Sequence, residues 1–413
     1  MGETTKEIRL AMIQFGDYRA AMDARAQDEP EVYRAQYASM AVVDELVEKG
    51  RCLVVCLDTE PYDEVRGNFR LIGGRFDPRS GGLRFQREAR RSGVAIIKHL
   101  AQFSPSHVIV RAPGWVMEQI GGWVLTRNIP LLPLFADFFY TQGLKDRIKN
   151  FRVVRLLNDA RITVVANHNY PACLSMVRAG VHARKVVPWD WVPVNRPEES
   201  PEKHLDTGDR PFRLFYAGAV SEDKGVGDLV EAVEYLTGEG MDISAEVCGG
   251  GAEMEGLSRL AETKGLGNAV VFRGMTPNRE VLKKMRAAHL AVVPSRHEYP
   301  EGLPNVIYEG FETRTPLICS DHPTFVMRLK DGVGCRMFPA RNPRALAQTI
   351  KAALSDPETY AALSSSTLEA WEGIQVPVTF DELLKDWVDS TWVNRPPAVL
   401  RHSLGESPLP GMR

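Results

Sequence analysis

Short apolar runs alternate with amphipathic stretches along this chain of 413 residues, and this alternation limits its fold more than any other feature. In the first half the apolar runs have the length of strands, and stretches with helical spacing separate them. The predicted strands are Ile8–Phe15, Cys52–Leu57, His107–Val110, Pro130–Phe135 and Ile162–Ala166. The predicted helices are Glu31–Lys49, Phe85–Gln102, Trp115–Arg127, Thr141–Leu157 and Tyr170–Ala179. This order predicts an α/β domain with a parallel sheet over residues 1–192.

The pattern stops at residues 193–211 and then restarts. Pro193–Pro211 contains four prolines and few apolar residues, which is typical of a linker. A second α/β domain is predicted over 212–375, with strands Phe212–Ala217, Ile243–Cys248, Ala269–Arg273, Leu290–Pro294 and Leu317–Ser320. A further amphipathic helix is expected at Phe380–Trp392. The proline-rich residues 394–413 are predicted to be a disordered tail.

Composition narrows the functional classes. A net charge of −2 argues against general nucleic-acid binding, which needs a strongly basic surface. The six cysteines form no CxxC pair or zinc pattern, so buried free thiols and a reducing, cytoplasmic compartment are expected. There is no apolar signal core at the N-terminus and no apolar run of the roughly 20 residues that span a bilayer.

The most informative local motif runs from Ser295 to Pro316 and contains Glu301 and Glu309. Pro304 suits the first turn of a helix, whose free N–H groups and positive dipole end bind anions such as a diphosphate. Gly302 lets the backbone approach that anion closely. The two carboxylates, one before the helix and one inside it, can each accept bonds from a pair of hydroxyls, for example on a sugar and on a ribose. The alternative is an ordinary acidic helix start.

Other second-domain residues lie at strand ends, where open α/β sheets bind ligands. Gly218 follows the first strand of this domain, and Lys224 precedes the next helix, so both are expected to face the crevice of Glu301. Lys224 can neutralise a diphosphate, although a solvated lysine at a helix start is the simpler interpretation. Gly249 opens a glycine turn that either contacts a ligand or only turns the chain, and Arg273-Gly274 can present a backbone edge to a nucleobase.

Taken together, these motifs resemble those of retaining glycosyltransferase family 4 (glycosyl transferases group 1). The resemblance covers roughly residues 212–355, where the Gly218 to Gly225 element, the glycine turn, the Phe-Arg-Gly strand end and the glutamate spacing occur in family order. It implies a GT-B fold: two Rossmann-like domains with parallel sheets facing a central cleft. The N-terminal domain would bind the acceptor, the C-terminal domain the nucleotide sugar, and residues 376–393 would cross back onto the N-terminal domain.

The resemblance also implies residue roles. Lys224 would contact the donor diphosphate, Glu301 would hold the transferring sugar and Glu309 the ribose. The helix start would meet sugar and phosphate through Gly302, Leu303, Pro304 and Asn305.

This chain departs from the family's pattern in several places, one of which is Trp189-Asp190-Trp191 in place of the usual Asn-Gly entry to the linker. Ala219 stands where an arginine is frequent, so the diphosphate charge falls to Lys224, or to Arg296 or Arg273. The glycine-rich loop of the first domain is reduced to Gly16-Asp17. Asp137 lies where many members have a catalytic histidine, and a helix N-cap explains it equally well.

The implied function is transfer of a sugar from a nucleotide diphosphate, UDP or GDP being expected, to a hydroxyl of a glycan, lipid-linked or small-molecule acceptor, with retention of the anomeric configuration. The absence of an Asp-x-Asp pair near a strand end predicts no metal site and no cofactor. A sugar-nucleotide 2-epimerase and a non-catalytic glycan- or partner-binding protein of the same fold remain as alternatives.

Two basic stretches of the first domain, Arg84–Lys98 and Lys145–Arg161, allow a further interpretation. Such helices can hold a peripheral enzyme against anionic lipid on the inner face of a membrane. A solvated helix face is the simpler explanation.

Overall fold

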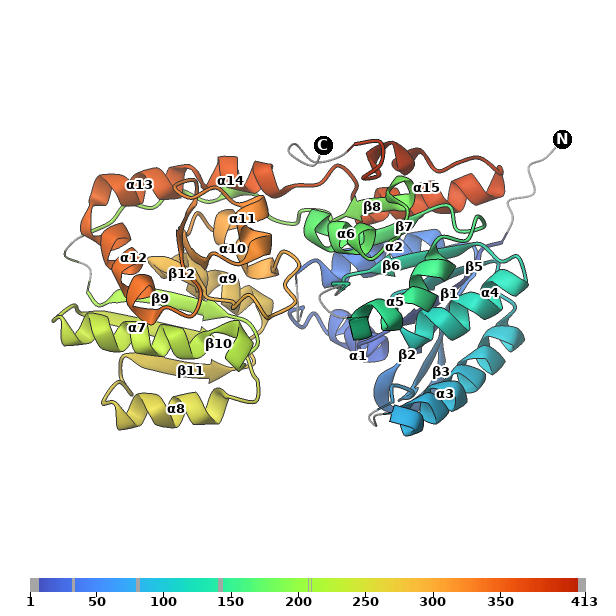
Figure 1. Ribbon diagram of the computed structural model, residues 1–413, viewed down its shortest axis with the longest axis horizontal. Coiled ribbons are helices and arrows are strands. Elements are labelled where there is room, and N and C mark those ends of the chain that lie inside the picture. The colour runs from blue at the N-terminus through green and yellow to red at the C-terminus, as the bar shows by residue number, and fades with distance from the viewer. Residues whose placement is uncertain are drawn as a thin grey trace. The chain divides into compact units, whose positions relative to one another are not determined.

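The computed structural model describes residues 7–31, 34–78, 82–139, 144–206, 208 and 210–407. The chain forms two compact units (Figure 1). Unit 1 comprises residues 1–29, 35–192 and 376–413, and unit 2 comprises residues 30–34 and 193–375.

The described part of unit 1 contains a sheet of eight strands in the order β3-β4-β2-β1-β5-β6-β7-β8. The strands are β1 Arg9–Gln14, β2 Arg51–Cys56, β3 Asp58–Arg66, β4 Phe69–Arg75, β5 His107–Val110, β6 Leu131–Phe135, β7 Val165–His168 and β8 Val186–Trp189. All neighbours pair in parallel except β3, which is antiparallel to β4. The sheet is thus parallel, as predicted, except at this edge, where the sequence predicted no strand. The exposed polar side chains of β3 gave no buried apolar run to indicate a strand.

Helices cover both faces of this sheet. They are α1 Tyr18–Ala26, α2 Gln36–Leu46, α3 Gly82–Phe103, the π-helical turn η1 Met117–Gly121, α4 Gly122–Thr126, α5 Leu144–Leu157, α6 Asn169–Arg178 and α15 Phe380–Trp392. The helix predicted at 31–49 begins only at Gln36, and the one predicted at 115–127 starts as η1.

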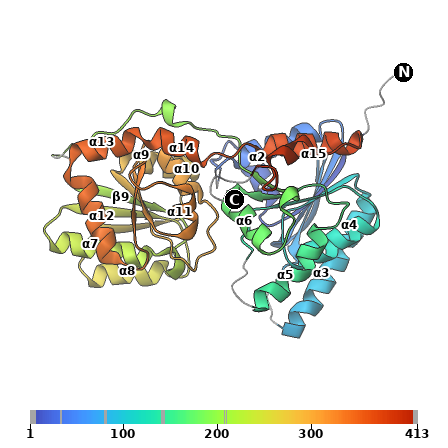
Figure 2. The same ribbon diagram turned by 45° about the horizontal axis from the view of Figure 1, so that its top comes forward.

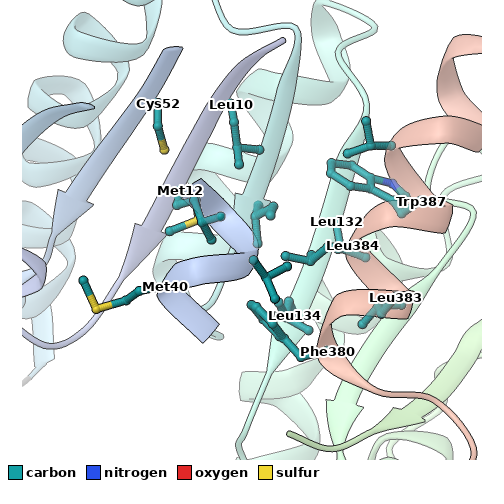
Figure 3. Packing of buried hydrophobic residues seen from close by; sticks show 14 of the residues in the cluster. Leu10, Met12, Met40, Cys52, Leu132, Leu134, Phe380, Leu383, Leu384 and Trp387 are labelled. Carbon is teal, nitrogen blue, oxygen red and sulfur yellow. The ribbon is translucent and has the colours of Figure 1, made fainter. Parts of the chain in front are cut away.

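Helix α15 completes one face of unit 1. Its apolar residues Phe380, Leu383, Leu384 and Trp387 are buried in one cluster with Leu10 and Met12 of β1 and Leu132 and Leu134 of β6 (Figure 3). Figure 2 shows α15 beside α2, and the Lys385 ammonium lies 2.9 Å from the Glu45 carboxylate there. Residues 376–413 are thus part of the first unit, although they end the chain.

Unit 2 has a parallel sheet of six described strands in the order β11-β10-β9-β12-β13-β14. The strands are β9 Phe212–Ala217, β10 Ile243–Cys248, β11 Val270–Gly274, β12 Leu290–Val293, β13 Leu317–Ser320 and β14 Cys335–Phe338. The helices are α7 Val226–Gly238, α8 Met254–Thr263, α9 Asn278–Ala287, α10 Asn305–Glu312, α11 Pro323–Arg328, α12 Pro343–Ser355, α13 Pro357–Ser365 and α14 Thr367–Ile374. Alternate residues of β9 enter opposite cores: Leu214 and Tyr216 pack in one, Phe215 in the other.

The segment predicted as a linker packs on unit 2. Pro197 and Leu205 are buried. The Lys203 ammonium donates to the Ala288 carbonyl at 2.7 Å, and the Arg314 guanidinium donates to the Pro197 carbonyl at 2.9 Å. Cations that bind backbone carbonyls hold this proline-rich stretch in place. Such contacts leave no pattern of apolar residues in the sequence.

The predicted disorder of residues 394–413 is not found over 394–407. This stretch contains the 3-10 turn Ala398–His402, and Val399 and Leu404 are buried in unit 1. Two apolar anchors are too few for a sequence pattern to show. Residues 408–413 lie outside the described residues.

All six cysteines are buried free thiols, as expected. Among the described residues, no helix is both long enough and apolar enough to cross a membrane.

Candidate functional site

The strand order of unit 2 reverses between β9 and β12, because β10 and β11 lie on one side of β9 and β12 to β14 on the other. Parallel sheets bind ligands beside the carboxyl ends of the strands at such a point. The loop after β9 carries Gly218 and Lys224, and the loop after β12 carries Ser295 and Glu301. The residues singled out in the sequence therefore gather at the position where this topology favours a ligand.

Lys224 and Glu301 form an ion pair across the switch point. Both side chains are largely buried, and the Lys224 ammonium lies 4.2 Å from the centre of the Tyr299 ring. The same Glu301 oxygen accepts a hydrogen bond from the Ser295 hydroxyl at 2.7 Å. An ammonium has three donors, so Lys224 can bind a phosphate while it keeps Glu301 as a partner.

Side chains from α11 hold the Glu301 loop. The Thr324 hydroxyl donates to the Glu301 carbonyl at 2.9 Å, and the ring of His322 bonds the Tyr299 carbonyl at 3.1 Å. Sequence reasoning missed both residues, because Asp321-His322-Pro323-Thr324 resembles an ordinary helix start. The carboxylate before α10 is thus held at its side chain and at its backbone.

Helix α10 begins at Asn305, and Pro304 is its N-cap with φ −70° and ψ 144°. The prediction that Pro304 would lie in the first turn is corrected by one residue. The first N–H groups of a helix have no partner within it, so this end can receive an anion. A Cβ on Gly302 would meet nothing within 4 Å, whereas the Leu303 side chain is buried in the core. The fold itself leaves space at residue 302.

Glu309 lies in the second turn of α10 and is buried. Its carboxylate accepts a hydrogen bond of 2.6 Å from the side-chain amide of Asn278, the first residue of α9. Burial raises the pKa of Glu309 to about 7. Asn278 was not identified from the sequence, because an asparagine after a proline resembles any helix start. Together, Asn278 and Glu309 can present a carboxylate and an amide to a diol.

The glycines at the other strand ends have backbone conformations that favour glycine, and one of them is also required by close backbone approach. Gly249 has φ +133°, and a Cβ there would lie 1.8 Å from the Gly218 carbonyl oxygen. The Gly249 N–H donates to the Gly274 carbonyl at 2.7 Å. Gly218 and Gly274 also have positive φ, at +153° and +73°. These three residues bring the ends of β9, β10 and β11 together.

The other cations considered for a diphosphate are engaged by carboxylates. The Arg273 guanidinium donates to Glu246 at 2.6 Å, and its side chain is half exposed on β11. Arg296 makes two hydrogen bonds to Asp228 of α7, at 2.7 and 3.2 Å. Lys224 is therefore the cation that the structure brings to Glu301.

The candidate residues of unit 1 occupy a different environment. Asp17 is the N-cap of α1, where its carboxylate accepts from the Ala20 N–H at 3.1 Å and from the Tyr62 hydroxyl at 2.9 Å. Gly16 has φ +85° and open space around its Cα. Asp137 follows β6 with an exposed side chain, and the Asn167 side chain bonds its N–H and its carbonyl at 3.2 and 2.8 Å. It caps none of the described helices.

The described residues contain no cluster of three or more His, Cys, Asp or Glu side chains that could hold a metal ion.

The chain is similar in sequence to a known family and to several known enzymes. Residues 197–369 match the family model Glycosyl transferases group 1. The alpha-D-kanosaminyltransferase of Streptomyces kanamyceticus is 32% identical over 151 residues, which cover 36% of this chain and 38% of that protein. The D-inositol 3-phosphate glycosyltransferase of Thermobispora bispora is 22% identical over 310 residues, which cover 66% of this chain and 68% of that protein. The chain spans about two fifths of the length of the first curated relatives that it matches, 38% and 43%.

Solved structures extend the likeness to both units. HepE of Anabaena, in complex with UDP and glucose, has a TM-score of 0.65 at 13% identity and covers 94% of this chain and 100% of its own. The sucrose-phosphate synthase of Thermosynechococcus elongatus has a TM-score of 0.65 at 17% identity over the same shares. The two α/β units thus have the GT-B fold, and residues 197–369, within unit 2, are similar to the glycosyl transferases group 1 family.

Proposed function

We propose that this chain transfers a sugar from a nucleotide-diphosphate donor to an acceptor hydroxyl with retention of the anomeric configuration. The observation that carries the proposal is the buried Lys224–Glu301 pair at the switch point of unit 2, next to the start of α10. Glu309 lies further along the same helix. A cation, a helix N-terminus and two carboxylates match the diphosphate and the two diols of a sugar nucleotide.

In this mechanism the departing diphosphate gains negative charge as the glycosidic bond breaks. Lys224 and the N–H groups at the start of α10 stabilise that charge, and groups that are already oriented lose little energy in reorganising. The transition state resembles an oxocarbenium ion. We assign Glu301 the positioning of the sugar: Lys224 and Ser295 bond one of its oxygens, which fixes the carboxylate so that its other oxygen can accept from sugar hydroxyls.

The remaining residues of the donor site contribute mainly through the backbone. Gly218, Gly249 and Gly274 shape the strand ends for the nucleotide, and Gly302, Leu303, Pro304 and Asn305 form the start of α10. Arg273 contributes its backbone at the end of β11, because Glu246 engages its side chain. We assign Glu309 to the ribose hydroxyls.

In unit 1 we propose that the Gly16-Asp17 backbone faces the sugar or the diphosphate, with the Asp17 carboxylate retained as a helix cap. We assign Asp137 the place that a histidine takes in the family. Its exposed side chain is available to a ligand.

The first test is a thermal-shift panel of UDP-, GDP- and ADP-sugars with the full chain. A donor at 100 times its dissociation constant adds about 2.7 kcal/mol to stability. A matching assay with the bound donor should yield free nucleotide diphosphate and a glycosylated acceptor whose anomeric configuration equals that of the donor. An epimeric sugar nucleotide would indicate the 2-epimerase instead, and binding without turnover the non-catalytic alternative.

Two relatives suggest acceptors to assay first. One is named for D-inositol 3-phosphate and the other, from Streptomyces kanamyceticus, for 2-deoxystreptamine. We therefore propose small polyhydroxylated acceptors as the starting class, with glycan and lipid-linked acceptors as further arms of the same assay.

We also propose that the protein works in the cytoplasm, which the six buried free thiols support. Peripheral contact with anionic lipid is a second proposal, based on α3, where Arg84, Arg87, Arg90 and Arg91 are exposed and Val94 is 63% exposed. Co-sedimentation with phosphatidylglycerol vesicles tests it, and phosphatidylcholine vesicles are the control. The side chains of residues 144–149, in the other basic stretch, lie outside the described residues.

A further inference from the structure

Residues 30–34 belong to unit 2, although α1 and α2, the helices on either side of them in the sequence, belong to unit 1. The Glu31 carbonyl accepts a hydrogen bond of 3.3 Å from the N–H of Asn278. Asn278 is the residue whose side chain holds Glu309. This short segment therefore contacts one support of the candidate ribose-binding carboxylate.

Arg34, at the end of the segment, contacts α10 itself. Its guanidinium donates two hydrogen bonds to one oxygen of Glu312, at 2.9 and 3.2 Å, and lies 4.5 Å from the centre of the Tyr308 ring. The side chains of Arg34 and Glu312 are only 4% and 2% exposed. A buried ion pair of this kind is costly to break on one side, because the remaining charge has no water to solvate it.

Glu309 and Glu312 lie three residues apart on α10, so their side chains lie on the same side of the helix. The segment thus contacts α10 through Glu312 and α9 through Asn278, and Glu309 lies between these two contacts. Neither Arg34 nor Glu312 is needed to explain the Lys224–Glu301 pair.

We propose that Arg34 is a positioning residue of the nucleotide site: its ion pair with Glu312 holds Arg34 against α10 and Glu31 against α9, and thereby fixes the Glu309 carboxylate for the ribose hydroxyls. The inference rests on the proposed function, because it assigns a support to the same donor site. It adds a residue from the first tenth of the chain to a site whose other residues all come from the second half.

The charges around Glu309 make this role measurable. Glu312 on its own helix and Glu31 of the segment are anionic and disfavour its ionised form, whereas Arg34 favours it; the Asn278 amide is neutral. Removal of Arg34 leaves only the two anions. Removal of the Glu312 charge leaves Arg34 in excess. Opposite changes in the pH dependence of binding are therefore expected for the two substitutions.

The experiment uses the full chain and titrates UDP or GDP, whichever the wild type binds, by calorimetry between pH 5.5 and 8.5. R34M should weaken binding about tenfold at neutral pH, which corresponds to the loss of about one hydrogen bond. It should also move the midpoint of the pH dependence upward, whereas E312Q should move it downward. R34M/E312L removes both charges and should return the midpoint toward the wild-type value. In turnover, R34M should raise the KM for the donor more than it lowers kcat.

R314M is the matched control. Arg314 is a buried arginine just after α10, but its partners are the Pro197 and Ser365 carbonyls at 2.9 and 3.1 Å. The R314M substitution should lower the melting temperature without moving the midpoint of the pH dependence of binding.

Wild-type affinity and midpoint in both R34M and E312Q, or midpoints that move in the same direction, would overturn the inference while the proposed function stands. If R34M does not fold, E312Q and the double variant carry the same comparison. No binding of either nucleotide by the wild type would overturn the proposed function, and this inference with it.

Discussion

The two sheets have the same kind of switch point, but different groups lie there. In unit 2 the order reverses between β9 and β12, and in unit 1 it reverses between β1 and β5. After β9 and β12, Lys224, Ser295 and Glu301 bind one another across the reversal. After β1, Asp17 caps α1 instead, and Arg111 after β5 donates to Gln14 at 3.1 Å.

This difference concerns which of the two switch points carries groups that can bind a sugar nucleotide. A diphosphate and two diols can be met by a lysine, a helix start and two carboxylates within one domain, and unit 2 has them. At the switch point of unit 1 the side chains instead cap a helix and bond to one another, as Asp17 and the Arg111–Gln14 pair do. The match to the glycosyl transferases group 1 model, over residues 197–369, lies entirely within unit 2.

The largest expected effect tests the cation at the switch point of unit 2. K224M should lower kcat/KM for transfer by about 10²–10³, because loss of one oriented charge-stabilising group costs about 3–4 kcal/mol in the transition state. Initial-rate kinetics of nucleotide diphosphate release measures it. K264M is the control. Lys264, at the end of α8, pairs with Glu234 of α7 at 2.6 Å on the surface. Near wild-type turnover in K224M would remove the distinction between the two switch points.

The next effect compares two glycines of unit 2. G249A should destabilise the protein by about 3 kcal/mol, because its Cβ would meet the Gly218 carbonyl in a backbone conformation unfavourable for alanine. G302A should unfold at the wild-type denaturant concentration, since space is open there, and should weaken only donor binding. Denaturant unfolding followed by calorimetry separates the two. Undiminished donor binding by G302A would contradict the close-approach role of residue 302.

Local sequence patterns predicted part of the fold and part of the candidate site. The sequence predicted the α/β class, the restart after residue 211 and α15, because strand and helix periods are visible in local patterns. It placed Glu301, Glu309 and Lys224 in one domain for the same reason. Asn278, Thr324 and Arg34 were not predicted, because each acts through a contact distant in sequence and lies in an unremarkable helix start or loop. Strand β3 and the packed linker were missed because polar side chains form them.

The role proposed for Asp137 of unit 1 can be tested by substitution. D137N should lower kcat about tenfold with an unchanged donor dissociation constant, because one charge-assisted hydrogen bond to the reacting sugar is weakened. Transfer rates at saturating donor, together with calorimetry, give both quantities. An unchanged kcat would leave unit 1 without a side chain in the chemistry.

A smaller effect follows from the pKa of Glu309. Burial raises that pKa from 4.5 to about 7, so the carboxylate is ionised above pH 7 and protonated below it. A protonated carboxyl no longer accepts bonds from two hydroxyls, and donor binding should weaken about tenfold between pH 8 and pH 6. In E309Q binding should be weaker throughout and independent of pH in this range. A wild type with flat binding between pH 6 and 8 would argue against Glu309 as a ribose ligand.

The smallest effect concerns the cap in unit 1. D17A should cost about 1 kcal/mol of stability through loss of the N-cap of α1 and leave donor affinity unchanged. Thermal unfolding and nucleotide titration of the same preparation check both. A large loss of affinity would show that the two switch points are more alike than the structure indicates.

We propose that the start of α10, flanked by Glu301 and Glu309, binds a nucleotide-diphosphate sugar. A crystal structure of the full chain with UDP or GDP is the decisive test. We expect the diphosphate to lie within hydrogen-bond distance of the Lys224 ammonium and the first N–H groups of α10, with the ribose hydroxyls on the Glu309 carboxylate. A nucleotide bound elsewhere, with the Lys224–Glu301 pair untouched, would contradict it.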